Sequence, residues 1–69
     1  MANTYLVSLA QEYLDTIDAP RSGQVAFHDF DHYASERSVL HEQLLQSLNH
    51  TREDGFDVEA WARETIRNV

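Results

Sequence analysis

The chain of 69 residues contains no cysteine, and it has only two glycines and one proline. Without cysteine it has no disulfide, no thiolate nucleophile and no cysteine-ligated zinc site. The scarcity of glycine and proline, the residues that mark turns, agrees with a helix-rich fold. A chain this short buries only about 60% of the surface that its unfolded form exposes, so its core must be simple. We therefore expect one domain over residues 1–69.

Lysine is also absent, and this absence makes the charge strongly negative. Twelve aspartates and glutamates stand against five arginines, for a net charge of −7. Nucleic acids and anionic membranes are bound by clustered basic surfaces, which this composition does not supply. We therefore expect no direct binding to nucleic acid and none to a membrane. A negative field instead attracts a basic surface on another macromolecule.

Long hydrophobic runs are missing as well. No apolar run approaches about 18 residues, the length that a membrane-spanning helix needs. The first nine residues lack the positively charged region and the long apolar segment of a signal peptide. These features predict a cytoplasmic protein.

Residues 4–18 form the clearest predicted helix. At about 100° per residue, its apolar side chains share an arc of about 160°, and polar side chains, Thr16 among them, fill the opposite arc. The apolar set is Leu6, Val7, Leu9, Ala10, Tyr13, Leu14 and Ile17. Pro20 disfavours the α conformation at Ala19, so we expect the helix to end there.

Residues 24–49 keep one helical phase of apolar side chains, and two interpretations fit this pattern. One continuous helix would be about 39 Å long. A break near residues 35–38 would instead give two shorter helices and a more compact bundle. We favour the break, because Ser35 is a possible N-cap and the apolar stripe is weakest there. Arg37 and His41 interrupt the stripe, and we expect both at the edge of the core with their polar ends turned outward.

A last helix is predicted after the polar loop at residues 51–55. Asp57 is a good N-cap, and Phe56 can pack on Trp61 as a hydrophobic staple. Glu59 precedes Arg63 by four residues, the favourable order for an ion pair on a helix. The predicted inner face consists of Val58, Trp61, Ala62, Ile66 and Val69. Together these segments predict an all-α fold, a small compact bundle of three to four helices.

No group of residues in the sequence dictates a reaction. His28 and His32 stand four residues apart and could share a metal ion, but no third ligand is fixed by spacing, so we predict a solvated helical face there. The serines and histidines lack the strand-to-helix elbow and the glycine-rich loop of nucleophilic hydrolases. A bundle this small also has little interior for a substrate pocket. We expect no catalytic residue, no metal, no cofactor and no enzymatic activity.

Carboxylates recur along the predicted polar surface. Glu12, Asp15 and Asp18 follow one another at i, i+3 spacing, about 5–6 Å apart. Asp29, Asp31 and Glu36 continue the series on the next segment, and we predict that these six residues bind a partner.

Spaced carboxylates on rigid helices resemble a row of backbone phosphates and can occupy the basic groove of a nucleic-acid-binding protein or effector complex. The exposed residues Tyr5 and Val39 are candidate apolar anchors for such an interface. The alternative is that the acidic residues only solubilise a small domain.

Small size, an acidic composition without cysteine or lysine, and the series Glu12, Asp15, Asp18, Asp29 and Asp31 resemble the small phage-encoded inhibitor proteins. Anti-CRISPR proteins belong to this class, and several of them are acidic DNA mimics. The resemblance implies stoichiometric blocking of a DNA-binding site on a host surveillance complex, without turnover. A second hypothesis is a helical interaction or regulatory protein, antitoxin-like or dimerising, whose partner meets an apolar helix face. The protein would be a monomer or a homodimer.

Overall fold

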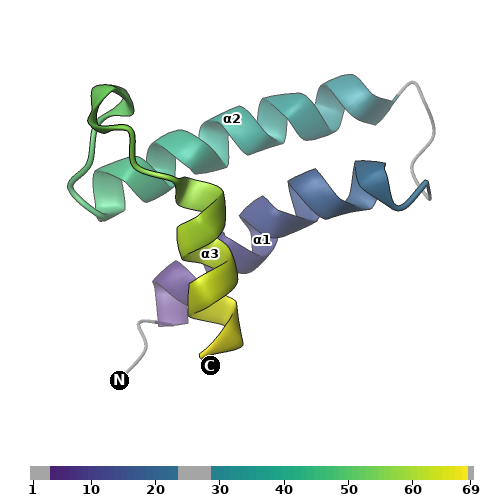
Figure 1. Cartoon of the computed structure of the whole chain (residues 1–69). Coiled ribbons are helices and arrows are strands. Elements are labelled where there is room, and N and C mark those ends of the chain that lie inside the picture. Colours follow the sequence, from purple (N-terminus) through teal and green to yellow (C-terminus); the bar gives the residue numbers. More distant parts are fainter. Residues whose placement is uncertain (1–3, 24–28, 69) are drawn as a thin grey trace.

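Three α-helices and one short 3₁₀ helix make up the parts of the chain that the computed structural model describes, residues 4–23 and 29–68 (Figure 1). The helices are α1 (Thr4–Arg21), α2 (Phe30–Ser47) and α3 (Val58–Arg67), and the 3₁₀ helix is η2 (Arg52–Asp54). These parts contain no strand. The prediction of a small all-α bundle is confirmed.

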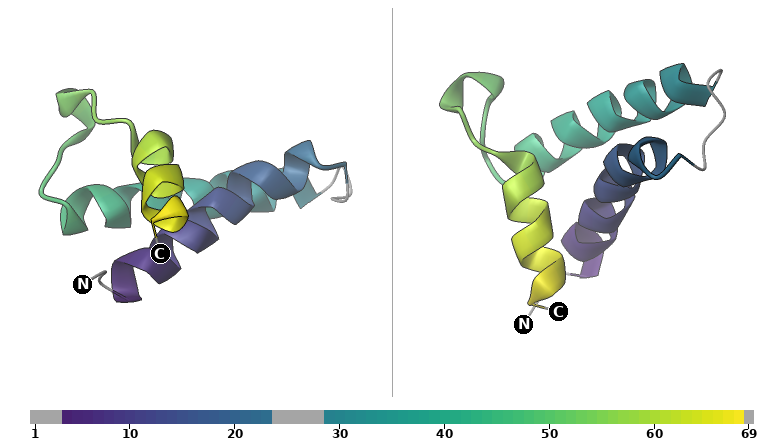
Figure 2. Two further views of the ribbon diagram at one scale, coloured as in Figure 1. Left: turned by 60° about the horizontal axis from the view of Figure 1, so that its bottom comes forward. Right: turned by 45° about the vertical axis from the view of Figure 1, so that its right-hand side comes forward.

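Helix α1 lies at the centre of the packing. It forms an antiparallel pair with α2, and α3 packs against it from another side (Figures 1 and 2). Helices α2 and α3 touch each other only sparingly. Two neighbours are needed because the apolar arc of α1 is wide. Its buried apolar residues are Leu9, Ala10, Tyr13, Leu14 and Ile17, as the periodicity predicts.

The C-terminal end of α1 differs from the prediction. The helix continues through Pro20 to Arg21, whereas the sequence predicts an end at Ala19. Proline at position 20 cannot donate a hydrogen bond to the Thr16 carbonyl and its ring crowds that carbonyl, yet Ala19 stays helical. The turn is still closed by the Ser22 amide, which donates to the Asp18 carbonyl at 3.0 Å, and by the Ser22 hydroxyl, which donates to the Ala19 carbonyl at 2.7 Å.

Thr16 also differs, since it is buried instead of lying on the polar face. It follows Leu9 by seven residues and so lies only about 20° from that core residue around the helix. Its hydroxyl donates to the Tyr13 carbonyl at 2.6 Å, which satisfies the buried polar atom within the helix.

Helix α2 runs without interruption through residues 35–38, so the predicted break is wrong. All four residues of this stretch are exposed. None of these polar side chains therefore has to be buried for the helix to continue. The buried residues Leu40, Leu44 and Leu45 all lie in the second half of the helix. Phe30 and Ala34, which share the apolar stripe, are exposed. The alternative prediction was one continuous helix over residues 24–49. The described helix covers Phe30–Ser47, and residues 24–28 lie outside the described parts.

An asparagine ends α2. Asn49 adopts a left-handed conformation with φ of 61°. The Asn49 amide then donates to the Gln46 carbonyl at 3.2 Å, and the His50 amide donates to the Leu45 carbonyl at 2.8 Å. This pair of bonds is the Schellman motif, and it turns the chain toward η2.

The connection from α2 to α3 is ordered by local hydrogen bonds. Thr51 and Asp54 form a capping box around η2, and Gly55 leaves it with φ of 71° in the left-handed region. Phe56 is partly buried, and its ring stacks on that of His50, with centroids 4.0 Å apart and planes 5° from parallel. The predicted polar loop thus contains a helical turn.

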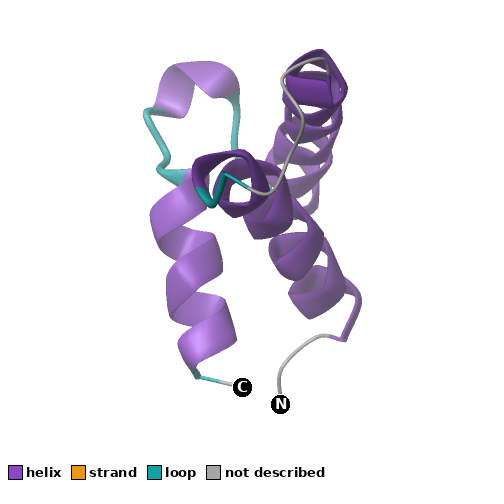
Figure 3. Ribbon diagram, turned by 90° about the vertical axis from the view of Figure 1, so that its right-hand side faces the viewer, coloured by secondary structure: helices purple, strands orange, loops and turns teal. Residues whose placement is uncertain are grey.

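The start and inner face of α3 agree with the prediction. The Asp57 side chain accepts a hydrogen bond from the Ala60 amide at 3.0 Å, as an N-cap does. Val58 and Ala62 are buried, and Trp61 and Ile66 pack on the core from its edge. Figure 3 shows α3 running beside α1, with the chain reaching it from η2. Val69 lies outside the described residues.

Leu44 is the fully buried leucine of α2, and its truncation tests the core. Leu44→Ala should lower the free energy of unfolding by about 2–5 kcal/mol, because it removes buried apolar surface and leaves a cavity. Urea unfolding followed by circular dichroism measures this loss. The control Val39→Ala lies on the same helix at 56% exposure and should stay within about 0.5 kcal/mol of the parent. Equal losses in the two variants would contradict the described core.

Candidate functional site: an acidic helix face and a basic pocket

The outward face of α1 carries Glu12 and Asp15. Both residues are exposed, and they lie on the side of the helix opposite the apolar arc that α2 and α3 cover. At i, i+3 spacing they are neighbours about 5–6 Å apart. Within residues 4–23 and 29–68, no ion pair engages either carboxylate. The two therefore present negative charge to solvent from a helix that is held on its other side.

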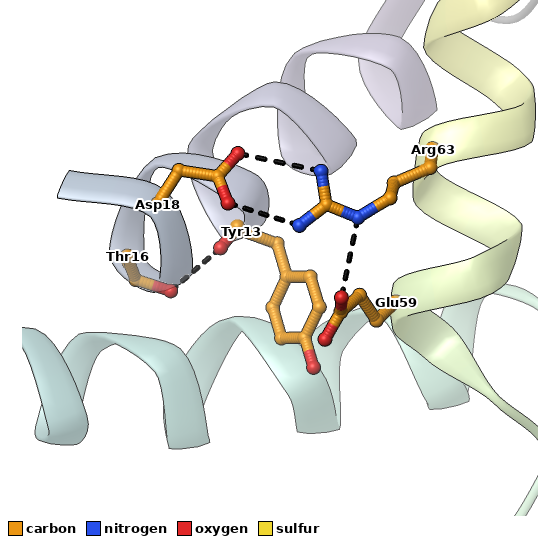
Figure 4. Close-up of polar contacts among 5 residues, drawn as sticks. All are labelled: Tyr13, Thr16, Asp18, Glu59 and Arg63. Carbon is orange, nitrogen blue, oxygen red and sulfur yellow. Dashed lines mark hydrogen bonds and ion pairs between the residues drawn. The ribbon is translucent and has the colours of Figure 1, made fainter. Parts of the chain in front are cut away.

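Asp18, the third residue of the predicted acidic series, joins α1 to α3. The Arg63 guanidinium donates to its two carboxylate oxygens at 2.9 and 3.4 Å, and the same guanidinium donates through Nε to Glu59 at 3.2 Å (Figure 4). The hydrogen bond from Arg63 holds the pKa of Asp18 below its ordinary value. The Asp18 side chain is 52% exposed, but the Arg63 guanidinium already neutralises its charge.

The three predicted residues of the second segment do not share one face. Asp29, Asp31 and Glu36 are all exposed, and Asp29 is the N-cap residue of α2. Because α2 is continuous, Asp31 and Glu36 lie about 140° apart around it, whereas Asp29 and Glu36 lie about 20° apart. The structure therefore places Asp29 and Glu36 on one flank of α2 and Asp31 on another. This part of α2 adjoins the C-terminal end of α1 in the helix pair (Figure 1).

Asp54 orders the turn between α2 and α3, and this role was not predicted. Its carboxylate accepts hydrogen bonds from the Thr51 amide at 2.9 Å and from the Thr51 hydroxyl at 3.2 Å, and it pairs with His50 Nδ1 at 3.1 Å. These bonds, the one from the Thr51 amide first, hold the pKa of Asp54 below its ordinary value. The sequence does contain the indication, because threonine followed three residues later by an acid is typical of a capping box.

A surface pocket of about 390 Å³ lies where α1, α2 and η2 meet. It is lined by Tyr13, Arg37, Ser38, His41 and Arg52. The rings of Tyr13 and His41 are 6.0 Å apart between centroids. His41 is half-buried and lies at the edge of the core as predicted, whereas Arg37 is exposed and lies outside the core. The pocket itself was not expected from the sequence, because Tyr13 and Arg52 are far apart along the chain.

The Tyr13 side chain connects the core to this pocket. Burial raises the pKa of its phenol, the nearby Glu59 carboxylate raises it further, and the Arg37 guanidinium opposes them. The phenol therefore stays protonated at neutral pH and can donate a hydrogen bond.

The described parts of the chain contain neither a candidate metal site nor a candidate membrane span. No group of three or more histidines, aspartates and glutamates there could hold a metal ion, and His28 lies outside those parts. None of the helices there has the length and apolar character that crossing a membrane requires.

No protein-family model, curated protein or solved structure matches the chain.

The link between Asp18 and Arg63 can be tested by removing either group. Asp18→Asn and Arg63→Gln should each lower the melting temperature by a few degrees at most, because the pair is half exposed. The double variant should lose no more than the larger single loss, since both substitutions break one interaction. Strictly additive losses would contradict a direct link.

The same pair predicts a pH dependence. The pKa of Asp18 is lower in the folded protein than in the unfolded chain. Its contribution is therefore complete above the unfolded value of about 3.9 and disappears as the pH falls through the folded value. The difference in melting temperature between the parent and Asp18→Asn should be constant from pH 7 to about pH 5 and shrink toward pH 2. A difference that grows on acidification would contradict the assignment.

Proposed function

We propose that this protein is a non-catalytic acidic inhibitor that binds the basic nucleic-acid-binding surface of a partner protein or complex, as DNA-mimicking anti-CRISPR proteins do. The observation that carries the proposal is the outward face of α1, where Glu12 and Asp15 are exposed and have no ion pair within the described parts of the chain. The opposite face of the same helix is buried against both other helices, which fixes the spacing of the two carboxylates.

The distribution of the arginines supports this proposal. Arg52 pairs with Glu42, Arg63 with Asp18 and Glu59, and Arg67 with Glu64. These three cations belong to η2 and α3, so they neutralise acidic groups near those elements. The outward face of α1 keeps its negative charge, and a field of this sign accelerates the encounter with a basic surface.

Mimicry at this face would work by occlusion. The arginine and lysine side chains that hold phosphates through charge-assisted hydrogen bonds hold carboxylates in the same way. A partner bound to Glu12 and Asp15 would therefore have those side chains occupied and could not hold a nucleic acid there. No bond is made or broken, so one inhibitor molecule blocks one site.

Tyr5 is placed to anchor such a contact. It is 60% exposed on α1. It precedes Glu12 by seven residues and so lies about 20° from it around the helix, on the same face. Aromatic residues are enriched among those that dominate interface energies. Val39 is 56% exposed but belongs to α2, so it is not part of this face.

The second hypothesis, an interaction module with an apolar helix face, has less support from the structure than from the sequence. The wide apolar arc of α1 is covered within the molecule. What remains is the first half of α2, where Phe30 is 40% exposed and Ala34 lies one turn further. This hypothesis predicts a homodimer that is insensitive to salt, whereas mimicry predicts a complex that salt dissociates.

The test compares two variants with the same change in net charge. Glu12→Gln combined with Asp15→Asn adds two units of charge on α1, and Glu53→Lys adds two units on the exposed η2 turn. The parent protein, immobilised and exposed to extract of its native host, should capture a nucleic-acid-binding complex that duplex DNA displaces. The α1 double variant should bind that complex at least about tenfold more weakly and with a flatter salt dependence. The Glu53→Lys variant should bind nearly as well as the parent.

Other outcomes would contradict the proposal. Equal weakening in the two variants would mean that only net charge matters. Undiminished binding of the α1 variant at every salt concentration would exclude this face as the contact. Asp18 is left unchanged in the test because its substitution also breaks the link to α3.

A further inference from the structure

The pocket between α1, α2 and η2 differs in chemistry from the rest of the molecule. The chain has twelve carboxylates and five arginines, yet two arginines and no carboxylate line this pocket. All five lining side chains can donate a hydrogen bond, since Tyr13, Ser38 and His41 accompany Arg37 and Arg52. A protein that is acidic elsewhere thus offers a concentrated set of donors at one place.

Arg37 is the cation available to a ligand. It is exposed, and no ion pair engages it among the residues that the structure describes. Arg52 is held in place by a hydrogen bond from its Nε to the Glu42 carboxylate. That bond fixes the side chain through one nitrogen and leaves the two terminal amino groups of the guanidinium for another acceptor.

Each acidic group around the pocket already has a partner, and one of these partners, Arg52, itself lines the pocket. Glu42 binds Arg52, Glu59 binds Arg63, and the Asp57 carboxylate caps α3 at the Ala60 amide. Glu59 and Asp57 act on Tyr13 at a distance, as their effect on its pKa shows. Their charges reduce the positive potential in the pocket, but none of these carboxylates lines it.

We propose that this pocket binds a small phosphate monoester. A phosphate group has three terminal oxygens that accept several hydrogen bonds, which suits two guanidinium groups together with hydroxyl and imidazole donors better than the two oxygens of a carboxylate do. The volume of about 390 Å³ lies in the range of small-molecule sites. The pocket does not include Glu12 or Asp15 of the outward face of α1. Phosphate binding can therefore be tested independently of the proposed function.

The test is a titration of the intact protein with phenyl phosphate at pH 7, followed by amide chemical shifts in nuclear magnetic resonance spectra. We expect saturable shifts that are concentrated around Arg37, His41 and Arg52. Arg37→Gln should raise the Kd at least about tenfold, the loss typical of one charge-assisted contact. The control Arg21→Gln makes the same charge change at an exposed position outside the pocket and should leave the Kd unchanged.

Two further ligands test whether the phosphate group of phenyl phosphate, and not its ring, makes the contacts. Inorganic phosphate should shift the same amides, because the oxyanion makes the contacts, and benzoate should bind at least several-fold more weakly. Benzoate binding as tight as that of phenyl phosphate would overturn the assignment to phosphate. Shifts that do not saturate, or equal losses in Arg37→Gln and Arg21→Gln, would overturn the site. Ser38→Ala, a change at an exposed position, gives a second variant that should weaken phosphate binding without disturbing the fold.

Discussion

The burial of the apolar face of α1 holds this molecule together. Helices α2 and α3 both pack on α1 and hardly on each other, so neither has another core to join. An apolar arc of about 160° is too wide for one neighbouring helix to cover, and the order of the chain supplies two. The same arrangement leaves α1 a single outward face, and that face is acidic.

Charge is distributed in keeping with this packing. The arginines of η2 and α3 are paired with acidic groups of the same chain, and these pairs link elements or stabilise helix turns. Arg63 does both, because it bridges from α3 to Asp18 on α1 while it pairs with Glu59 one turn away. Glu12 and Asp15 are not among these partners, whereas a pocket with two arginines lies in the angle between α1, α2 and η2. A strongly acidic chain can thus contain one basic site.

Features governed by local periodicity could be predicted from the sequence. The apolar arc of α1, the Asp57 cap and the Glu59–Arg63 pair each depend on residues that lie close together in the sequence. Two predictions were wrong because they depended on how the helices pack. Thr16 is buried because it borders Leu9, and the polar residues 35–38 stay helical because they lie outside the core. Pro20 did not end the helix at Ala19, because the amide and the hydroxyl of Ser22 still close the last turn behind it.

In the candidate site, too, local features could be predicted from the sequence and tertiary contacts could not. Exposure of the six acidic residues follows from helical phase, and all six are exposed. The bond between Asp18 and Arg63 joins residues 45 positions apart in the sequence, and no local pattern indicates it. The pocket likewise combines Tyr13 with Arg52 from separate elements, so only the tertiary arrangement reveals it.

Carboxyl footprinting can establish whether the outward face of α1 is the partner-binding surface, because it reports on each acidic side chain separately. A carbodiimide and an amine would label the carboxylates of the free protein and of the protein bound to its captured partner, with mass spectrometry to locate the labels. Glu12 and Asp15 should be protected in the complex, and Glu53 should be labelled as fast as in the free protein. Unchanged labelling of Glu12 and Asp15, with protection elsewhere, would contradict the assignment of the α1 face as the binding surface.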